Sequence, residues 1–252
     1  MESKMNLHAQ IAKWIEKQVK AAGAKGCVVG LSGGVDSATV AALCKKAFPK
    51  TTLALIMPCF SNPLDRQHAL LVAQKFGIET KEIELTPALQ ALYRCLEGKE
   101  CLPDYKDLAS ANLRPRLRMS ALYYFANKLN YLVVGTGNKS EVVMGYFTKY
   151  GDGGVDIEPL GGLLKKEVRE LAKKLGVPKE VLNKPPSAGL WHGQTDEGEM
   201  GITYGELDKI IEAIESGKEK KCNPKLLAKV KKRMRQSRHK FSAPPVFKAK
   251  EI

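Results

Sequence analysis

Four segments along the chain have the apolar pattern expected for the strands of one buried sheet. Three are continuous apolar runs, as in strands covered on both faces, and the segment 78–85 alternates between apolar and polar positions. Segments with helical periodicity separate them, and strands that alternate with helices pair in parallel. We therefore predict an α/β fold: a doubly wound, mostly parallel sheet with helices on both faces. The predicted strands are 26–31, 51–57, 78–85 and 131–134.

Between and after the strands, apolar residues recur with the period of an α-helix. At the N-terminus they are Leu7, Ile11, Trp14 and Ile15, interleaved with charged residues, which predicts an amphipathic helix. A short helix is expected after Pro87. The other predicted helices are 35–48, 64–76, 117–129, 164–175, 204–216 and 224–240.

Two segments have no periodicity and are predicted to be loops throughout. Residues 146–162 are rich in glycine, and 183–201 is a run of about nineteen turn-forming residues. Loops of that length in compact domains are usually functional lids or disordered segments. We expect a single domain over 1–252 with a mobile loop near 185–201, and we find no internal repeat.

Composition narrows the class of protein. No run of eighteen apolar residues is present, and the charged N-terminus lacks the apolar core of a signal peptide, so we expect a cytoplasmic protein without a membrane span. The six cysteines form no C-x-x-C pair, which argues against a zinc knuckle or a thioredoxin-type site. Cys27 and Cys44 lie in apolar runs, and we expect most of the thiols to be buried and reduced.

The net charge of +14 is concentrated in a basic, helical C-terminus at 218–250, where thirteen Lys or Arg residues face a single acid, Glu219. Such a segment indicates nucleic acid, anionic small substrates, or only a solvated helix face. No Phe, Tyr or Trp occurs from 218 to 240 to stack on bases. We favour anionic substrates, with no nucleic acid as partner.

The strongest local motif is a serine- and glycine-rich turn between the first strand and the helix 35–48. Its glycines allow the backbone to approach a ligand closely, and its N–H groups, with those of the helix start, favour an anion. The alternative is a helix cap after an ordinary glycine turn. The predicted phosphate-binding residues are Gly30, Leu31, Ser32, Gly33, Gly34, Val35, Asp36 and Ser37.

Asp36 would repel a bare phosphate, so its position in the turn predicts a bridging cation, for which Mg²⁺ is the natural choice. No G-K-[ST] follows the glycines, so this is not a Walker A loop, and the positive charge must come from elsewhere in the chain. The order serine, glycine, glycine, aspartate and serine resembles the PP-loop of the ATP pyrophosphatases. That resemblance implies an adenine nucleotide α-hydrolase-like fold and AMP chemistry, but leaves the acceptor open.

A second block of sequence resembles ammonia-dependent NAD synthetases and indicates the acceptor. It comprises 134–141 (VGTGNKSE) and 145–160 (GYFTKYGDGGVDIEPL), and 116–119 (RLRM) also fits. The resemblance covers about residues 10–248. It implies that ATP adenylates the carboxylate of deamido-NAD and that ammonia then displaces AMP, giving NAD and pyrophosphate.

The resemblance also implies site residues, none of them an acid or base catalyst. Glu141 would hold Mg²⁺ with Asp36, although alone it could equally stabilise a helix N-terminus. Lys165, otherwise a solvated helix charge, would contact the ATP phosphates, and Ser187 replaces a threonine of the family pattern. The implied ATP contacts beyond the loop are Thr136, Lys165 and Ser187, and the implied deamido-NAD contacts are Arg116, Lys149, Asp156, His239 and Lys240.

The source of nitrogen and the assembly follow from the same comparison. A glutamine-using enzyme would need a further domain, for which 252 residues leave no room, so we expect ammonia. The resemblance implies a homodimer, for which the first helix and the helix 117–129 offer apolar faces. The rival interpretations are another PP-loop enzyme, such as a tRNA-modifying lysidine synthetase or thiolase, and a non-catalytic nucleotide sensor.

Overall fold

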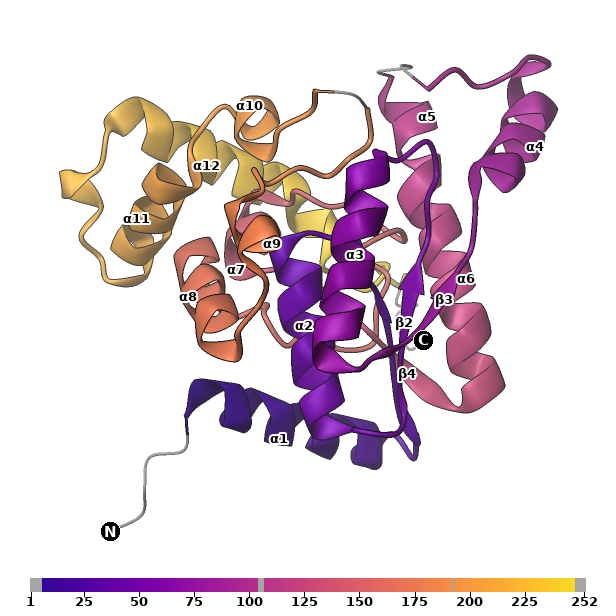
Figure 1. Ribbon diagram of the computed structural model, residues 1–252. Helices are drawn as coiled ribbons and strands as arrows, with labels where there is room; N and C mark the ends of the chain where they lie inside the picture. The colour runs from indigo at the N-terminus through magenta and orange to yellow at the C-terminus, as the bar shows by residue number, and fades with distance from the viewer. Residues whose placement is uncertain (1–5, 104–106, 192, 248–252) are drawn as a thin grey trace, which may run out of the picture.

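The computed structural model describes residues 6–103, 107–191 and 193–247 (Figure 1). Residue 192 of the predicted mobile loop 185–201, and 248–250 of the basic segment 218–250, lie outside the described residues. One four-stranded sheet forms the centre, in the order β3-β2-β1-β4, and each adjacent pair is parallel. This confirms the predicted α/β class. The strands are β1 (Gly26–Gly30), β2 (Thr52–Ile56), β3 (Glu79–Glu82) and β4 (Tyr131–Val134).

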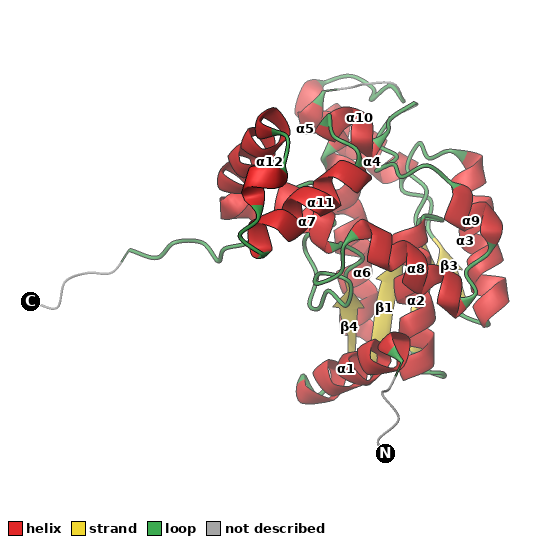
Figure 2. Ribbon diagram, turned by 90° about the vertical axis from the view of Figure 1, so that its left-hand side faces the viewer, coloured by secondary structure: helices red, strands yellow, loops and turns green. Residues whose placement is uncertain are grey.

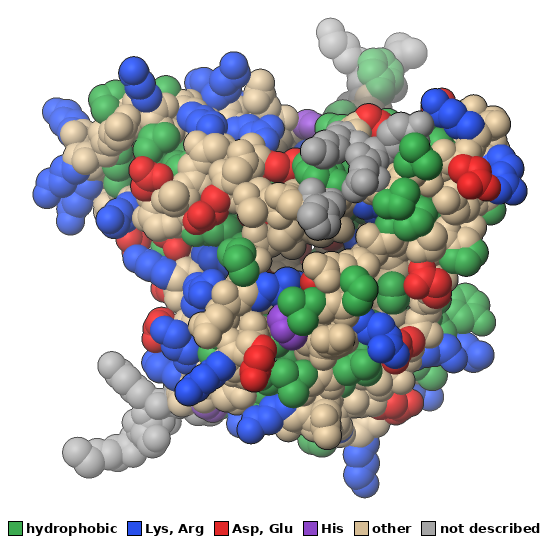
Figure 3. Space-filling model, turned by 45° about the horizontal axis from the view of Figure 1, so that its top comes forward, with side chains coloured by type: hydrophobic (Ala, Val, Ile, Leu, Met, Phe, Trp, Pro, Cys, Tyr) green, Lys and Arg blue, Asp and Glu red, His purple; other side chains and the backbone are tan. Residues whose placement is uncertain are grey.

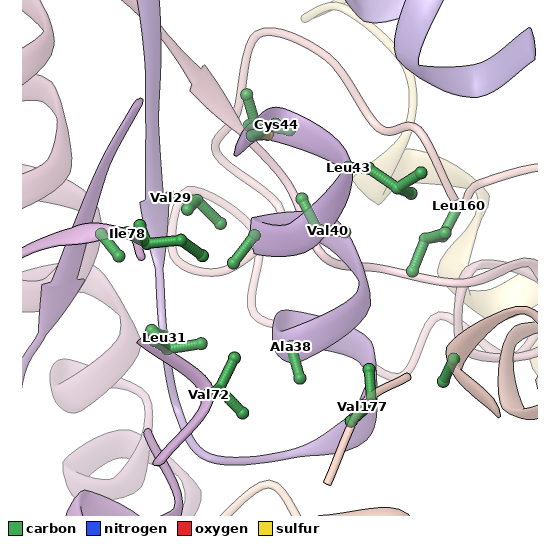
Figure 4. Packing of buried hydrophobic residues seen from close by; sticks show 14 of the residues in the cluster. Val29, Leu31, Ala38, Val40, Leu43, Cys44, Val72, Ile78, Leu160 and Val177 are labelled. Carbon is green, nitrogen blue, oxygen red and sulfur yellow. The ribbon is translucent and has the colours of Figure 1, made fainter. Parts of the chain in front are cut away.

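Alternating residues of β1 supply two hydrophobic cores, one on each face of the sheet. Val29 packs with apolar residues of the helices on one face (Figure 4), whereas Val28 packs with those on the opposite face. Both valines are fully buried. The first face is covered by α1 (Leu7–Ala21), α2 (Val35–Ala47), α3 (Pro63–Phe76) and α8 (Lys165–Leu175), and the second by α4 (Thr86–Glu97) and α6 (Leu113–Leu129). Figure 1 shows strands between α2 and α3 on one side and α6 on the other, and Figure 2 views the sheet from the first face, with α2 and α8 in front.

The C-terminal helices pack around a third apolar cluster beside the sheet (Figure 1, orange and yellow). Its fully buried members include Leu207 and Val230, and Met144 joins them from the helix that follows β4. The cluster therefore attaches the basic end of the chain to the carboxyl edge of the sheet. Its helices are α7 (Lys139–Met144), α10 (Asp196–Met200), α11 (Tyr204–Glu215) and α12 (Pro224–Ser237).

Several boundaries differ from the prediction. Helix α6 begins at Leu113, four residues before the predicted start, and Pro115 fits because it lies in the first turn, where an N–H group has no helical acceptor. The prediction of loop throughout 183–201 was wrong over α10. Thr195 caps that helix by accepting from Gly198 N, but five residues with an internal glycine are too few to show periodicity. The remaining short elements are α5 (Leu108–Ala111), α9 (Lys179–Asn183), and the 3₁₀ turns η1 (Glu219–Lys221) and η2 (Arg238–Lys240).

The cysteines are all free thiols, and four of the six are buried. Cys27 and Cys44 are fully enclosed in the core, as predicted, whereas Cys95 is exposed and Cys222 partly so. Among the described residues, no helix is both long and apolar enough to span a bilayer.

Candidate active site

A cleft of about 1110 Å³ opens at the carboxyl ends of the strands. Its walls include Leu31 after β1, Met57 after β2 and Thr136 after β4. The chain leaves β1 through α2 on one face of the sheet and enters β4 from α6 on the other face, so the strand order changes direction between β1 and β4. Open α/β sheets bind ligands at such a point. Figure 3 looks onto this end of the molecule, where the surface is hollowed near its centre.

The predicted phosphate loop forms one wall of the cleft. Gly33 has a φ of +74°, and a Cβ atom there would lie 2.2 Å from the carbonyl oxygen of Asp65, so this position requires glycine. The hydroxyl groups of Ser32 and Ser37 are 3.0 Å apart, and Ser37 Oγ accepts from Ser32 N. The loop thus presents hydroxyl and N–H groups at the N-terminus of α2, where the helix dipole favours an anion.

Two carboxylates and one ammonium group meet beside this loop. The Nζ atom of Lys165 lies 2.5 Å from Oδ2 of Asp36 and 3.2 Å from Oε1 of Glu141. Asp36 and Glu141 lie in the first turns of α2 and α7, and Lys165 is the first residue of α8. The side chain of Lys165 is only 2% exposed, which excludes a solvated helix charge.

Burial and charge together set the proton affinities of this cluster. Burial raises the pKa of Glu141 to about 7, opposed by the charge of Lys165 and reinforced by that of Asp36. Burial by itself would lower the pKa of Lys165, but the two carboxylates outweigh it, so the pKa of Lys165 is raised. The lysine therefore stays protonated, and a positive charge lies beside the predicted phosphate loop.

Asn138 connects the two carboxylates. Its side-chain amide donates to Asp36 Oδ1 at 3.0 Å, its Oδ1 accepts from Glu141 N, and its own backbone N–H donates to Glu141 Oε2. The last two bonds form a capping box at the start of α7. Asn138 has no exposed surface, so both carboxylates are held by one fixed side chain.

Side chains from the C-terminal helices contact this group of charges. The hydroxyl group of Tyr204 lies 3.1 Å from Glu141 Oε1 and 3.0 Å from Asp196 Oδ2, and its ring lies 4.8 Å from Lys165 Nζ. Burial, and then the neighbouring carboxylates, raise the pKa of Tyr204 well above its usual range. Tyr204 therefore remains a neutral hydrogen-bond donor toward the carboxylates.

The residues expected to contact deamido-NAD are only partly brought together. Lys149 Nζ donates to the carbonyl oxygen of His239 at 2.7 Å. Lys240 Nζ donates to the carbonyl oxygens of Gly145, at the end of α7, and of Phe147 in the glycine-rich loop. These bonds join η2 to that loop at the rim of the cleft, which Arg116 also lines. Asp156 does not line the cleft: its carboxylate accepts from Val133 N and from a tyrosine hydroxyl group.

The segment predicted to be a mobile lid crosses the cleft and is attached at both sides. Lys184 Nζ lies 2.7 Å from Asp65 Oδ1 in α3, and the buried Arg114 guanidinium donates to the carbonyl oxygen of Leu190. Ser187 lines the cleft between these attachments. Apart from Gly33 and Asp156, every residue predicted for the site lines this one cleft.

A family model described as NAD synthase matches residues 7–244. The chain belongs to the NAD synthase family.

Relatives in this family match almost the whole chain. The NH(3)-dependent NAD(+) synthetase of Carboxydothermus hydrogenoformans is 49% identical over 238 residues, covering 94% of this chain and 95% of the relative. Among solved structures, an NMN synthetase from Francisella tularensis gives a TM-score of 0.86 at 39% identity, with 98% of this chain and 100% of that chain covered. The NH3-dependent NAD synthetase from Campylobacter jejuni gives 0.81 at 32% identity, with 96% and 98% covered.

Sequence reasoning missed three residues that shape this NAD synthase site. Asn138 carried a signal, because Asn-x-x-Glu after a predicted strand has the spacing of a capping box. No sequence signal pointed to Tyr204 or Asp196. They lie in α11 and α10, and the packing of these helices around the third apolar cluster brings both side chains to the site.

Proposed function

We propose that this chain catalyses the amidation of deamido-NAD by ammonia, with ATP converted to AMP and pyrophosphate. The observation that carries the proposal is the contact of Lys165 with Asp36 and Glu141 beside a glycine-rich anion loop. The cleft around this contact, about 1110 Å³, exceeds the roughly 300–1,000 Å³ of an ordinary ligand site, which suits an enzyme with more than one substrate. Family membership identifies the reaction class.

In the first step, the nicotinate carboxylate attacks the α-phosphorus of ATP. The P–O bond to the β-phosphate breaks, and pyrophosphate leaves toward the loop. Ser32 and Ser37, whose hydroxyl groups lie 3.0 Å apart in the cleft, would donate to the phosphate oxygens, and Lys165 would neutralise the charge that develops on the leaving group. This assigns the chain a role in positioning and electrostatic stabilisation, without an acid or base catalyst.

The donor set at the site suits Mg²⁺. Among the described residues no group of three or more His, Cys, Asp or Glu side chains forms a complete metal site. Asp36 and Glu141 offer two carboxylates, and Mg²⁺ is usually held by one or two carboxylates together with substrate phosphates and water. When bound, the ion would neutralise phosphate charge. Asp36 and Glu141 are the residues proposed to hold it, with Asn138 fixing their orientation.

In the second step, ammonia attacks the acyl carbon of the adenylate, and AMP leaves. An acyl-adenylate also reacts with water, so the site must be closed at this stage. Lys184 and Arg114 attach the segment that carries Ser187 across the cleft, and this arrangement supports a role for 185–201 as a lid.

The proposal extends to the surroundings of the enzyme. The proposed nitrogen source is ammonia, and the proposed assembly is a homodimer. The proposed location is the cytoplasm, where free thiols such as the six found here persist. Part-exposed apolar side chains along α6, with Tyr124 60% exposed, are the proposed dimer surface.

The test is to incubate the purified protein with ATP, Mg²⁺, deamido-NAD and ammonium, and to quantify NAD, AMP and pyrophosphate. We expect the three products in equal amounts. Formation of ADP and orthophosphate would refute attack at the α-phosphorus, and ATP binding without turnover would favour a nucleotide sensor.

The likeness to an NMN synthetase makes the mononucleotide acceptor a second candidate. Both acceptors carry the same nicotinate carboxylate, so the cluster around Lys165 does not discriminate between them. The same assay with nicotinate mononucleotide in place of deamido-NAD separates the two. A higher kcat/KM for deamido-NAD supports the first proposal, and the reverse order supports the second.

A further inference from the structure

Helix α8 begins in a way that is unfavourable by itself. Its N-cap residue, Leu164, has no polar side-chain atom to accept from the first N–H groups. Its first two residues, Lys165 and Lys166, put positive charges at the positive end of the helix dipole. Only Glu167 counters this locally, by accepting from Leu164 N. The sequence at the start of α8 therefore does not account for the fixed position of Lys165.

The missing caps come from two other helices. Ser140 in α7 accepts from Lys165 N at 3.0 Å, and Asp208 in α11 accepts from Lys166 N through Oδ2, also at 3.0 Å. The Ser140 hydroxyl group then donates to Asp208 Oδ1 at 2.5 Å. The carboxylate of Asp208 thus receives both the hydroxyl group and one helix N–H, and it orients the hydroxyl oxygen toward the other.

This link is sealed from solvent and is not an ordinary ion pair. Asp208 is 2% exposed and Ser140 is fully buried. Lys166, whose backbone N–H bonds Asp208, directs its Nζ atom to Glu212 at 2.6 Å instead. A buried carboxylate paired with N–H and O–H donors costs desolvation, which the donors and the positive end of the helix offset.

The link joins the parts of the site that carry charge. Ser140 precedes Glu141 in the chain, the capped residue is Lys165, and α11 also carries Tyr204, whose hydroxyl group lies beside Glu141. Helix α11 packs against both α7 and α8. Asp208 in α11 thus fixes the position of α7, which carries Glu141, relative to α8, which carries Lys165.

We propose that Asp208 is a positioning residue: acting through Ser140 and the start of α8, it places the Lys165 ammonium group between Asp36 and Glu141. The expected effect on kcat rests on the proposed function, whereas the expected displacement of Lys165 does not. Asp208 does not line the cleft, so its effect on the site passes through its neighbours.

The test compares Asp208→Asn and Asp208→Ala with the matched control Glu212→Gln. An asparagine at 208 keeps one acceptor oxygen, and an alanine keeps none. Glu212→Gln also removes a carboxylate charge, one turn further along α11, where the Glu212 side chain bonds that of Lys166. We expect kcat to fall by roughly 10- to 100-fold in Asp208→Ala and less in Asn, the scale set by a displacement of about 1 Å in a catalytic group. KM for deamido-NAD and the activity of Glu212→Gln should not change.

A second readout does not depend on turnover. The rate at which acetic anhydride modifies Lys165, followed by mass spectrometry, should be low in the wild type and in Glu212→Gln, and higher in both Asp208 variants. Should the Asp208 variants fail to fold, Ser140→Ala breaks the same link from the other side and should show the same pair of effects.

The outcomes separate the two claims. A lowered melting temperature with unchanged kcat and unchanged labelling of Lys165 would show that Asp208 only stabilises the fold, which overturns the proposal. If the wild-type protein forms neither AMP nor pyrophosphate, the proposed function fails, whereas faster labelling of Lys165 in the Asp208 variants would still support the positioning role.

Discussion

Asn138 and Asp36 lie 102 residues apart in the chain, yet the amide of Asn138 donates to the Asp36 carboxylate at 3.0 Å. The same side chain caps α7 at Glu141 N. A single buried amide therefore determines how the two proposed metal ligands face each other. Loss of this amide should lower the activity by more than the accompanying loss of stability explains.

Replacing Asn138 by alanine should lower the rate of adenylation by more than its cost in stability explains. The lost cap should cost about 1 kcal/mol in the free energy of unfolding. In addition, Asp36 loses its donor and can rotate away from Glu141. Thr203→Ala is the matched control, because Thr203 forms the capping box of α11 and does not line the cleft. Urea unfolding should show destabilisation in both variants, larger in Asn138→Ala because its buried side chain also bonds Asp36. Pyrophosphate release should fall in Asn138→Ala alone. Equal activities would contradict the role given to Asn138.

Asp36→Asn should abolish adenylation at ordinary Mg²⁺ concentrations and leave the fold intact. The amide keeps the shape of the side chain but removes a proposed metal ligand and, of the two carboxylates, the one closer to Lys165 Nζ. Circular dichroism should be unchanged while AMP formation is lost. A variant that turns over normally would exclude Asp36 as a ligand.

The stability of the metal-free protein should depend on pH through Glu141. The charged and titratable groups that face it are Lys165, Asp36, Asp196 and Tyr204. Because the folded pKa is raised from 4.5 to about 7, the native state holds a proton that the unfolded chain releases, so stability falls as pH rises through this window.

The measurement for Glu141 is thermal unfolding in EDTA at pH 5 and pH 8. Glu141→Gln mimics the protonated form, so the wild type should lose more stability than the variant between the two pH values. An identical change in both proteins would show that Glu141 does not titrate in this window. For the same reason, the affinity of the wild type for Mg²⁺ should weaken below about pH 7.

Lys240→Ala should raise KM for deamido-NAD several-fold, with less effect on ATP. Lys240 attaches η2 to the end of α7 and to the glycine-rich loop through the carbonyl oxygens of Gly145 and Phe147, so its loss loosens the rim of the proposed dinucleotide site. Lys232→Ala, an exposed charge on α12, is the control and should leave KM unchanged.

The basic surface of the C-terminal helices, at the upper left of Figure 3, should bind nucleic acid only weakly. Mobility shifts with tRNA are expected to show association that disappears as salt rises, as for non-specific electrostatic binding. Tight binding that resists salt, together with an unchanged KM in Lys240→Ala, would assign this surface to another partner.

The sequence by itself determined the strands, the parallel sheet and the phosphate loop. These features depend on neighbours in the chain: an apolar run such as 26–31 is a buried strand wherever it packs, and a turn with the φ of Gly33 accepts few other residues. Resemblance in the glycine-rich block then indicated the family. Local patterns of this kind need no knowledge of distant contacts.

Only the tertiary structure decided which charges meet. Lys165 and Asp36 are 129 residues apart, and nothing in the sequence around Lys165 distinguishes it from the exposed Lys166 beside it. The packing of α7, α8 and α11 buries one and leaves the other outside. The same packing gives Asp208 its place, and the pairing of β4 with the following loop turns Asp156 onto Val133 N, away from the cleft. Which side chains are buried, and which groups they bond, depends on elements that folding brings together from distant parts of the chain. The residues next to a side chain in the sequence therefore do not reveal either property.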